Sequence, residues 1–308
     1  MSSDRVVLGT AALGLNGREA AFEILDEYVR LGGRTLDTAA IYSDWVPGET
    51  RRSEGVIGEW LKARGNRDDL FIITKGCHPV IGTTQSRLDA ASIRADIDMS
   101  LQRLGTDRID LWFLHKHDPK ADVPEIVGTL QDIHKQGKIL AFGSSNWPVP
   151  RMNEALAIPG VTFTANQVLG NVFARLIAGP PDPTNLAIDA QMFRHAVDNG
   201  LGLYLYSATA HGYFERRAAG KAPAREYQLA AIDEAATKLE ALAAKAGVRP
   251  SEMILAALLQ LAAPVHAIVA ASSVEQLRAT WKGGELLLPP DIVRETLAAT
   301  GMSDVVQV

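Results

Sequence analysis

The sequence predicts an α/β fold, a (β/α)8 barrel that forms one domain over residues 1–308. Short apolar runs recur eight times along the chain, and amphipathic helical segments lie between them. Eight strands that alternate with helices over about 300 residues are typical of this barrel. A doubly wound sheet is the main alternative, but the first βα turn, Gly9–Gly14, lacks the three spaced glycines of a dinucleotide-binding fingerprint. The barrel is therefore favoured.

The predicted strands are near-continuously apolar and mostly bounded by Gly, Asp or Pro, as strands buried on both faces of a parallel sheet are. They are Val6–Leu8, Thr35–Asp37, Leu70–Thr74, Leu111–His115, Leu140–Ser144, Phe163–Gln167, Gly202–Tyr206 and Ala267–Ala270.

The predicted helices carry apolar residues at helical spacing. In Ser92–Leu104 these residues recur at steps of four, four and three, and Gly105 follows as a C-cap. The other predicted helices are Val56–Ala63, Val123–His134, Ala230–Ala246 and Ser251–Ala263. Residues 169–186 and the gap before the last strand form extended loops, and such loops usually shape the site of a barrel.

The composition is that of a globular protein, with 47% hydrophobic and 22% charged residues, which excludes a disordered chain, a collagen and a coiled coil. No run of about 18 apolar residues occurs and the first residues lack an apolar signal segment, so we expect neither a membrane span nor a secretory leader. A net charge of −5 argues against nucleic acid or an anionic membrane as partner. The single cysteine, Cys77, excludes internal disulfides and indicates a cytoplasmic protein.

Four reactive side chains follow three neighbouring strands, where barrel enzymes place their sites. Asp37 and Tyr42 come at and after the end of the second strand, Lys75 follows the third, and His115 ends the fourth. A phenol with a pKa of about 10 is a poor acid at neutral pH, but a neighbouring ammonium favours the phenolate. The set therefore suits proton donation to the alkoxide that forms when a carbonyl accepts a hydride, and a nicotinamide would have to supply that hydride.

The ordered motifs resemble the aldo-keto reductase superfamily, in its bacterial form, over nearly the whole chain. They are LDTAAIY, RRSEGVIGEWL with Ser53, Glu54 and Gly58, FIITKG, SLQRLGTDRIDLWFLH, GKILAFGSSNW, Asn166-Gln167 and Tyr206-Ser207. This resemblance implies an NAD(P)H-dependent reductase on a (β/α)8 barrel. The catalytic Asp, Tyr, Lys and His of the family correspond to Asp37, Tyr42, Lys75 and His115.

The resemblance also implies the residues that bind the cofactor. Those for the nicotinamide carboxamide are Ser145, Asn146 and Gln167, while Tyr206 stacks on the ring and Ser207 and Thr209 approach the pyrophosphate. Gly9, Thr10 and Ala11 line the first turn, Asp37 is a further cofactor contact, and Ala271, Ser272, Gln276 and Thr280 lie where the family binds the 2′-phosphate and adenine.

The chain departs from the family pattern at the adenosine end. Ala270 and Gln276 stand where better-known members carry a basic residue and an arginine, and Ala208-Thr209 replaces Pro-Leu after Tyr206-Ser207. Neutral donors in place of charged ones weaken discrimination without reversing it, so we predict that NADPH is preferred and that NADH is used more weakly.

The substrate predicted for this site is a small-molecule carbonyl compound, and sugar-derived, aromatic and aliphatic carbonyls fit equally. Trp45 and Trp147 are the predicted aromatic walls and His115 a further substrate contact, with His117, Asp118 and His78 as additional rim candidates. Three alternatives stay open: a Schiff-base aldolase that uses Lys75, a metal hydrolase that uses His115, His117 and Asp37, and a non-catalytic subunit that senses a cofactor.

Overall fold

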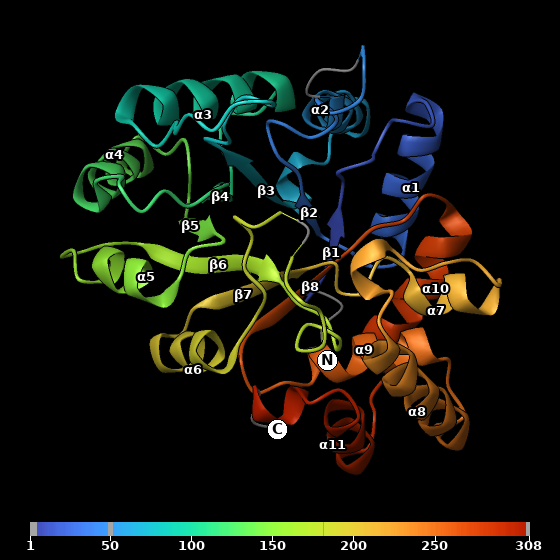
Figure 1. Ribbon diagram of the computed structural model, residues 1–308. Helices are drawn as coiled ribbons and strands as arrows, with labels where there is room; N and C mark the ends of the chain where they lie inside the picture. The colour runs from blue at the N-terminus through green and yellow to red at the C-terminus, as the bar shows by residue number, and fades with distance from the viewer. Residues whose placement is uncertain (1–4, 49–51, 181, 306–308) are drawn as a thin grey trace. The chain divides into compact units, whose positions relative to one another are not determined.

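The computed structural model describes residues 5–48, 52–180 and 182–305 of the chain. Eight strands close into a barrel in sequence order, which confirms the predicted fold (Figure 1). Neighbouring strands pair in parallel, for example with Leu8 opposite Leu36 and Lys75 opposite Phe113. The strands are β1 (Val6–Gly9), β2 (Thr35–Asp37), β3 (Phe71–Gly76), β4 (Leu111–Leu114), β5 (Phe142–Ser145), β6 (Phe163–Leu169), β7 (Gly202–Tyr206) and β8 (Val265–Val269).

Among the described residues, one helix follows each strand from β1 to β6. Helices α7, α8 and α9 lie between β7 and β8, and α10 and α11 follow β8. They are α1 (Arg18–Arg30), α2 (Arg52–Arg64), α3 (Ala90–Leu104), α4 (Val123–Lys135), α5 (Val149–Leu156), α6 (Ala190–Asn199), α7 (Tyr213–Ala218), α8 (Ala230–Ala246), α9 (Pro250–Leu259), α10 (Val274–Glu285) and α11 (Pro290–Ala298). Short 3-10 turns occur at η2 (Arg67–Asp69), η3 (Arg225–Tyr227) and η4 (Met302–Asp304).

Most predicted boundaries differ from the observed ones by a few residues, and for two of them the reason lies outside the local sequence. Strand β8 begins at Val265, two residues before the predicted start, because the polar residue His266 fits the strand by stacking on Tyr204 of β7 at 4.4 Å. Helix α9 ends at Leu259 and not at Ala263. There the Gln260 side chain exchanges two hydrogen bonds with the backbone of Leu288.

The described chain divides into two compact units. The N-terminal unit consists of Leu8–Asn166 with Ala270–Val274, and the C-terminal unit consists of Gln167–Val269 and Glu275–Val308 with the short segment Met1–Val7. Each unit is described by itself below. The single domain over residues 1–308 stays a prediction.

The N-terminal unit packs α2, α3 and α4 along the outer side of β2, β3 and β4 (Figure 1). Helix α3 is capped at its start by Asp89, whose carboxylate accepts the Ser92 N–H at 2.9 Å, and at its end by Gly105, which has the left-handed conformation. Ile93 and Ile97 are fully buried. Helix α2 approaches α3 at Gly58, where a Cβ would lie 2.2 Å from the Arg103 carbonyl oxygen, so only glycine fits.

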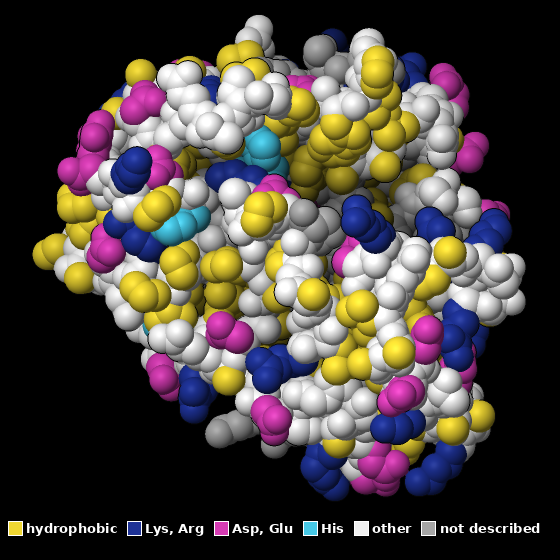
Figure 2. All heavy atoms as spheres, in the orientation of Figure 1, with side chains coloured by type: hydrophobic (Ala, Val, Ile, Leu, Met, Phe, Trp, Pro, Cys, Tyr) yellow, Lys and Arg dark blue, Asp and Glu magenta, His cyan; other side chains and the backbone are white. Residues whose placement is uncertain are grey.

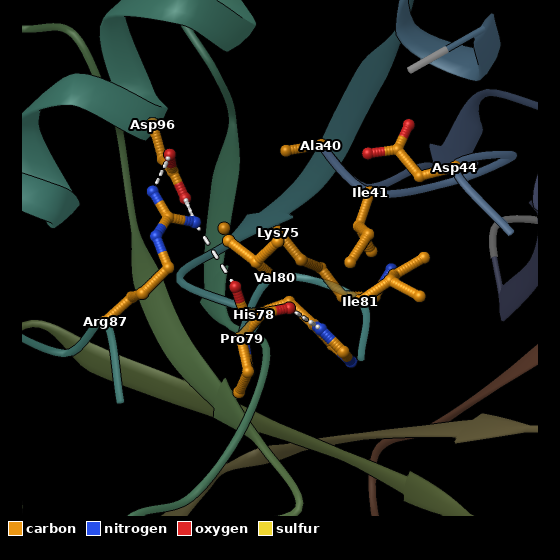
Figure 3. Close-up of a pocket in the computed structure, with 11 residues that line it drawn as sticks. Ala40, Ile41, Asp44, Lys75, His78, Pro79, Val80, Ile81, Arg87 and Asp96 are labelled. Atoms are coloured by element: carbon orange, nitrogen blue, oxygen red, sulfur yellow. Dashed lines mark hydrogen bonds and ion pairs between the residues drawn. The ribbon is translucent and has the colours of Figure 1, made fainter. Parts of the chain in front are cut away.

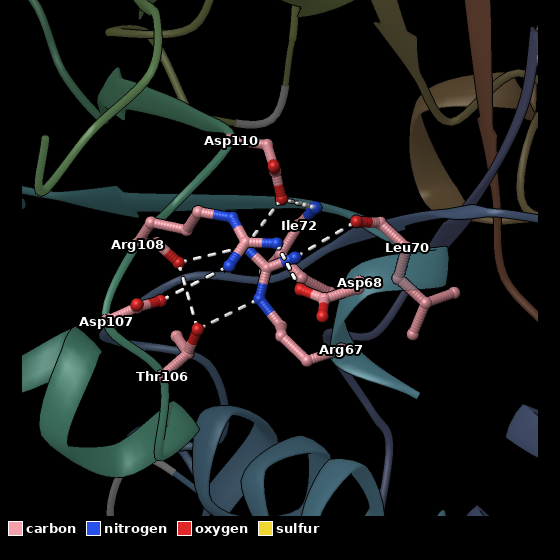
Figure 4. Close-up of polar contacts among 8 residues, drawn as sticks. All are labelled: Arg67, Asp68, Leu70, Ile72, Thr106, Asp107, Arg108 and Asp110. Carbon is pink, nitrogen blue, oxygen red and sulfur yellow. Dashed lines mark hydrogen bonds and ion pairs between the residues drawn. The ribbon is translucent and has the colours of Figure 1, made fainter. Parts of the chain in front are cut away.

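The amino ends of β3 and β4 are tied together by Arg67 of η2. Its guanidinium bonds the Asp110 carboxylate at 2.8 Å and the carbonyls of Leu70 and Arg108 at 3.0 and 2.9 Å (Figure 4). Asp110 also accepts the Ile72 N–H at 2.7 Å. Every bond in this cluster joins a group that precedes or begins a strand, so the cluster sets how β3 and β4 enter the sheet.

None of the helices in residues 5–48, 52–180 and 182–305 combines the length and the apolar character needed to cross a membrane.

Candidate active site

The carboxyl ends of β2, β3 and β4 bring Asp37, Lys75 and His115 to one rim of the N-terminal unit. The strand register fixes this placement, because the Thr38 N–H donates to Ile73 on β3 and the His115 N–H donates to Gly76 at 2.9 Å. Tyr42 reaches the same rim from the loop that follows β2. The structure thus brings together all four residues predicted as catalytic.

Lys75 and Asp37 form a buried ion pair. The Nζ atom of Lys75 lies 2.8 Å from both carboxylate oxygens of Asp37 and 2.7 Å from the Thr38 carbonyl oxygen, so its three protons have three acceptors. Both side chains are at most 2% exposed. Burial lowers the pKa of Lys75, while attraction to Asp37 acts in the opposite direction.

Tyr42 is held beside this ion pair. Its ring centre lies 4.8 Å from the Lys75 ammonium, and its hydroxyl oxygen lies 3.5 Å from Asp37 Oδ2, at the limit of a hydrogen bond. The ring meets the His115 imidazole edge-on, with 6.0 Å between centroids. The phenol is half-buried and therefore remains accessible at the rim.

His115 is a neutral imidazole at this rim. Burial, and then the positive charge of Lys75, lower its pKa well below the ordinary value of 6.5. Its Nδ1 atom is buried and has no hydrogen-bond partner in the described part of the chain. A neutral imidazole donates from one nitrogen and accepts at the other. The ring can therefore present a donor or an acceptor but not a full charge.

A chain of hydroxyl groups supports Asp37 from behind. The Thr10 hydroxyl donates to the Asp37 carbonyl at 2.8 Å and meets the Ser53 hydroxyl at 2.7 Å, and Ser53 in turn meets the Thr38 hydroxyl at 2.8 Å. All these groups are buried. The sequence pattern around Ser53 was visible but its role was not, since the partners are 15 to 43 residues apart.

The neighbouring Glu54 is a second supporting residue. Its fully buried carboxylate accepts the Thr74 hydroxyl at 2.6 Å and the Arg103 guanidinium at 2.7 Å. Thr74 precedes Lys75 in β3, so this network fixes the strand that carries the ammonium.

The residues predicted to bind a nicotinamide carboxamide lie at two strand ends. Ser145 is the last residue of β5, and Asn146 follows with φ +61° and donates to the Ser145 hydroxyl at 3.0 Å. Gln167 lies on β6 and is buried. Asn166 pairs instead with Ser144 and with the Trp147 carbonyl, which is a structural role.

The other predicted cofactor residues lie at strand ends, on loops and on helix α10. In the C-terminal unit, Tyr206 ends β7 half-buried, and Ser207 follows with φ +57° and its hydroxyl 3.2 Å from His211 Nε2. Burial raises the pKa of Tyr206. Thr209 and Thr280 are half-buried and Gln276 is exposed on α10. In the N-terminal unit Gly9, Ala11 and Ala271 are half-buried and Ser272 is exposed.

The two predicted aromatic walls have different environments. Trp45 is 51% exposed and meets the Tyr42 ring edge-on at 6.0 Å. Trp147 is only 1% exposed, donates to the Lys116 carbonyl at 3.2 Å and packs between His117 and Phe163. Trp45 therefore lies where a substrate would meet it, and Trp147 supports the rim from inside.

The additional rim candidates surround His115. His78 meets the His115 ring edge-on at 5.1 Å and its Nδ1 lies 2.7 Å from the Pro79 carbonyl. Burial lowers the pKa of His117, whose Nε2 has no partner in the described part of the chain. Asp118 accepts the Lys120 N–H at 2.8 Å. The described residues contain no cluster of three or more His, Cys, Asp or Glu side chains suited to a metal ion.

Taken together, the rim holds a phenol beside a buried ammonium–carboxylate pair and a neutral imidazole. An ammonium next to a phenol favours loss of the phenolic proton. The arrangement can therefore deliver one proton to an oxygen that gains negative charge, in a site without a metal ligand set among the described residues.

Comparison with known proteins identifies the family of this chain. The sequence model of the Aldo/keto reductase family matches residues 5–298. Norsolorinic acid reductase B of Aspergillus parasiticus is 30% identical over 280 residues, which cover 84% of this chain and 69% of that protein. An aryl-alcohol dehydrogenase [NADP(+)] of Phanerodontia chrysosporium is 32% identical over 163 residues, which cover 49% and 41% of the two chains. A thermostable aldo-keto reductase solved with the inhibitor epalrestat has a TM-score of 0.74 at 24% identity and covers 96% of this chain and 94% of its own.

Proposed function

Because the chain belongs to the aldo/keto reductase family, we propose that it reduces an aldehyde or ketone to an alcohol, with NADPH as the preferred hydride donor and NADH as a weaker one. The observation that carries this proposal is the position of the Tyr42 phenol, 4.8 Å from the Lys75 ammonium and in edge contact with the His115 imidazole. A Schiff-base lysine must be neutral and reachable, whereas Lys75 is 1% exposed and ion-paired.

The chemistry of the donor set fits a nicotinamide cofactor. A carboxamide needs donors and acceptors of the kind that Ser145, Asn146 and Gln167 offer, and the half-buried Tyr206 offers a ring for stacking. When bound, the nicotinamide supplies the hydride. Gln276 and Ser272 are the exposed neutral donors that we assign to the 2′-phosphate.

Tyr42 acts as the general acid in this proposal. The substrate oxygen accepts a hydrogen bond from the phenol, and the phenolic proton moves to that oxygen as the carbonyl carbon gains the hydride, which completes the alcohol. Lys75 stabilises the phenolate that remains, and Asp37 keeps the ammonium charged and oriented. His115 donates from Nε2 to the same oxygen, so that its buried Nδ1 is left as an acceptor.

The names of the relatives suggest which carbonyl compounds to test first. One relative is a norsolorinic acid reductase and another an aryl-alcohol dehydrogenase, so we propose aromatic aldehydes and ketones as substrates, with the protein acting as a cytoplasmic enzyme. The test is a panel of aromatic, aliphatic and sugar-derived carbonyls, with the loss of NADPH absorbance as the readout. We expect consumption that depends on the carbonyl compound. A borohydride-trapped adduct on Lys75 without NADPH consumption would instead indicate the aldolase.

The cofactor preference is tested in the same assay. We expect kcat/KM with NADPH to exceed that with NADH by about 10- to 100-fold, since neutral hydrogen-bond donors hold the 2′-phosphate without an arginine fork. An equal or higher kcat/KM with NADH contradicts this preference but leaves the reductase proposal in place.

A further inference from the structure

A cavity of about 200 Å³ lies beside the rim, within the N-terminal unit (Figure 3). Its walls come from the loop after β2, the end of β3, the loop after β3 and helix α3. The lining residues are Ala40, Ile41, Asp44, Lys75, Gly76, His78, Pro79, Val80, Ile81, Arg87 and Asp96. We call this cavity the β3-loop pocket. Neither Tyr42 nor His115 lines it, but it shares Lys75 with the proposed catalytic set.

The tip of the β3 loop presents two aliphatic side chains on a tight turn. The Thr83 N–H and hydroxyl both donate to the Val80 carbonyl, at 2.9 and 2.8 Å, and Gly82 has φ +84°. A positive φ at the third position is what a type II turn requires. Turns of this kind usually carry polar residues, yet Val80 is 62% and Ile81 49% exposed.

Such exposed aliphatic side chains on an exposed turn call for an explanation. Their own packing does not supply it, because backbone and Thr83 hydrogen bonds hold the turn. Figure 2 shows hydrophobic side chains gathered beside a histidine over the region of β2 and α2. Trp45 is 51% exposed and lies on the loop after β2, which also contributes to the pocket wall. This face of the unit therefore offers an apolar surface to a ligand.

The base of the β3 loop is fixed by an ion pair between the half-buried Arg87 and the buried Asp96. Arg87 binds both oxygens of Asp96, at 2.6 and 2.9 Å, and also donates to the His78 carbonyl at 3.2 Å. The Asp96 carboxylate accepts the Cys77 N–H at 2.7 Å, which holds Cys77 at φ +63°. Because hydrogen bonds hold both the tip and the base of the loop, the pocket is formed before a ligand binds.

The charges of the lining exclude an anionic occupant. Lys75 is paired with Asp37 and Arg87 with Asp96, so neither cation of the lining is left to hold an anion. The remaining lining side chains are mostly aliphatic. No cluster suited to a metal ion occurs among the described residues. The occupant that matches is neutral and apolar.

The volume sets the size of that occupant. A cavity of about 150 Å³ in another protein holds benzene, so about 200 Å³ holds one ring with a small substituent. The pocket opens next to Lys75, whose ammonium lies 4.8 Å from the Tyr42 ring. His78, which also lines the pocket, meets the His115 ring edge-on at 5.1 Å, so the pocket adjoins the rim that carries the proposed acid.

We propose that the β3-loop pocket is the substrate subsite that receives a neutral ring attached to the carbonyl group, and that Val80 and Ile81 determine specificity for it. This inference rests on the proposed reductase function. The substrates it implies for the reductase are neutral aryl carbonyl compounds. Acidic aryl carbonyls are poor ligands of the subsite because the Lys75 and Arg87 cations are already paired with carboxylates.

The test compares two double variants of matched exposure. V80A/I81A removes the aliphatic wall of the pocket, and V197A/L287A removes two side chains, 45% and 61% exposed, from elsewhere on the chain. The readout is the ratio of kcat/KM for benzaldehyde to that for propanal, with NADPH. We expect V80A/I81A to lower the ratio by about 5- to 20-fold and V197A/L287A to leave it within about twofold. An unchanged ratio in V80A/I81A overturns the subsite and leaves the reductase function intact.

A second variant provides a readout that does not depend on turnover. Ala40→Leu extends a side chain into the pocket, and the binding of benzyl alcohol is followed by ligand-observed NMR, with melting curves to check folding. We expect at least about fivefold weaker binding than in wild type.

If wild type consumes no NADPH with any carbonyl compound, the reductase proposal fails, and this binding measurement then decides the subsite alone. Equal binding in both proteins, or no binding in wild type, overturns it. Should A40L not fold, the same titration of V80A/I81A decides.

Discussion

The two ends of β3 and β4 carry polar clusters of opposite character. At the amino ends, Arg67 donates from all three of its side-chain nitrogens to Asp110, Thr106 and backbone carbonyls (Figure 4). At the carboxyl ends, Lys75 is also saturated, but His115 keeps a buried nitrogen without a partner in the described chain and the Tyr42 hydroxyl reaches Asp37 only at 3.5 Å. One end is built to hold strands and the other keeps reactive groups available.

The choice of cation sharpens this difference. A guanidinium offers a planar fork of donors, which suits Arg67 to a structural ion pair. Lysine and histidine change pKa when buried, and the pKa values of both Lys75 and His115 are lowered at the carboxyl ends. Barrels commonly divide stability and chemistry between their two faces in this manner.

The largest expected effect on kcat comes from replacing the proposed acid, Tyr42, in the carboxyl-end cluster. Tyr42→Phe keeps the ring and removes the proton, so we expect kcat to fall by at least about 10²-fold while cofactor binding is retained. Tyr28→Phe is the matched control, because its hydroxyl bonds the buried Thr35 carbonyl away from the rim. That variant should lose about 1 kcal/mol of stability and keep its activity. More than about a tenth of wild-type kcat in Tyr42→Phe contradicts the assignment.

Lys75→Met tests the role of the ammonium group at the carboxyl ends of β3 and β4. A neutral side chain no longer favours the phenolate, so we expect a decrease in kcat of about 10²-fold. The Asp37 carboxylate is left buried without its ammonium, which we also expect to lower the free energy of unfolding by about 3 kcal/mol. Steady-state kinetics and urea unfolding measure the two effects. A variant with normal kcat and low stability would make Lys75 a structural residue only.

Arg67→Met is the corresponding change at the amino ends. It leaves Asp110, whose side chain is 11% exposed, without its guanidinium, and we expect a loss of about 2 kcal/mol in urea unfolding. Because no rim group is touched, kcat at saturating substrate should stay within about threefold of wild type. A loss of activity comparable to that of Lys75→Met would remove the division between the two ends.

The smallest effect concerns the pH dependence of stability. The depressed pKa of His115 means that the unfolded chain binds a proton below about pH 6.5 while the folded chain does not, so folding loses stability as pH falls. His115→Asn should reduce the loss between pH 7.5 and 5 by at most about 2 kcal/mol. Equal slopes in wild type and His115→Asn would show that His115 titrates normally.

Much of the fold follows from local sequence patterns. The boundaries of β2 and β7 and of helix α8 agree with the predicted ranges, because each apolar run is bounded by turn residues that no distant contact overrides. Strand β8 was shifted by His266, whose polarity is tolerated only through a ring stack on the neighbouring strand. Such pairings are invisible to a local reading.

In the site, too, some features follow from the local sequence and others depend on distant contacts. The sequence by itself determined which side chains meet, because residues at the ends of consecutive parallel strands share one rim whatever surrounds them. Only the tertiary structure decided their states: the burial of Lys75, the enclosure of Trp147, the use of Thr10 and Ser53 as supports, and the pocket walled by Val80 and Ile81. Burial and hydrogen-bond saturation depend on partners far along the chain, 38 residues apart for Lys75 and Asp37. No local pattern encodes them.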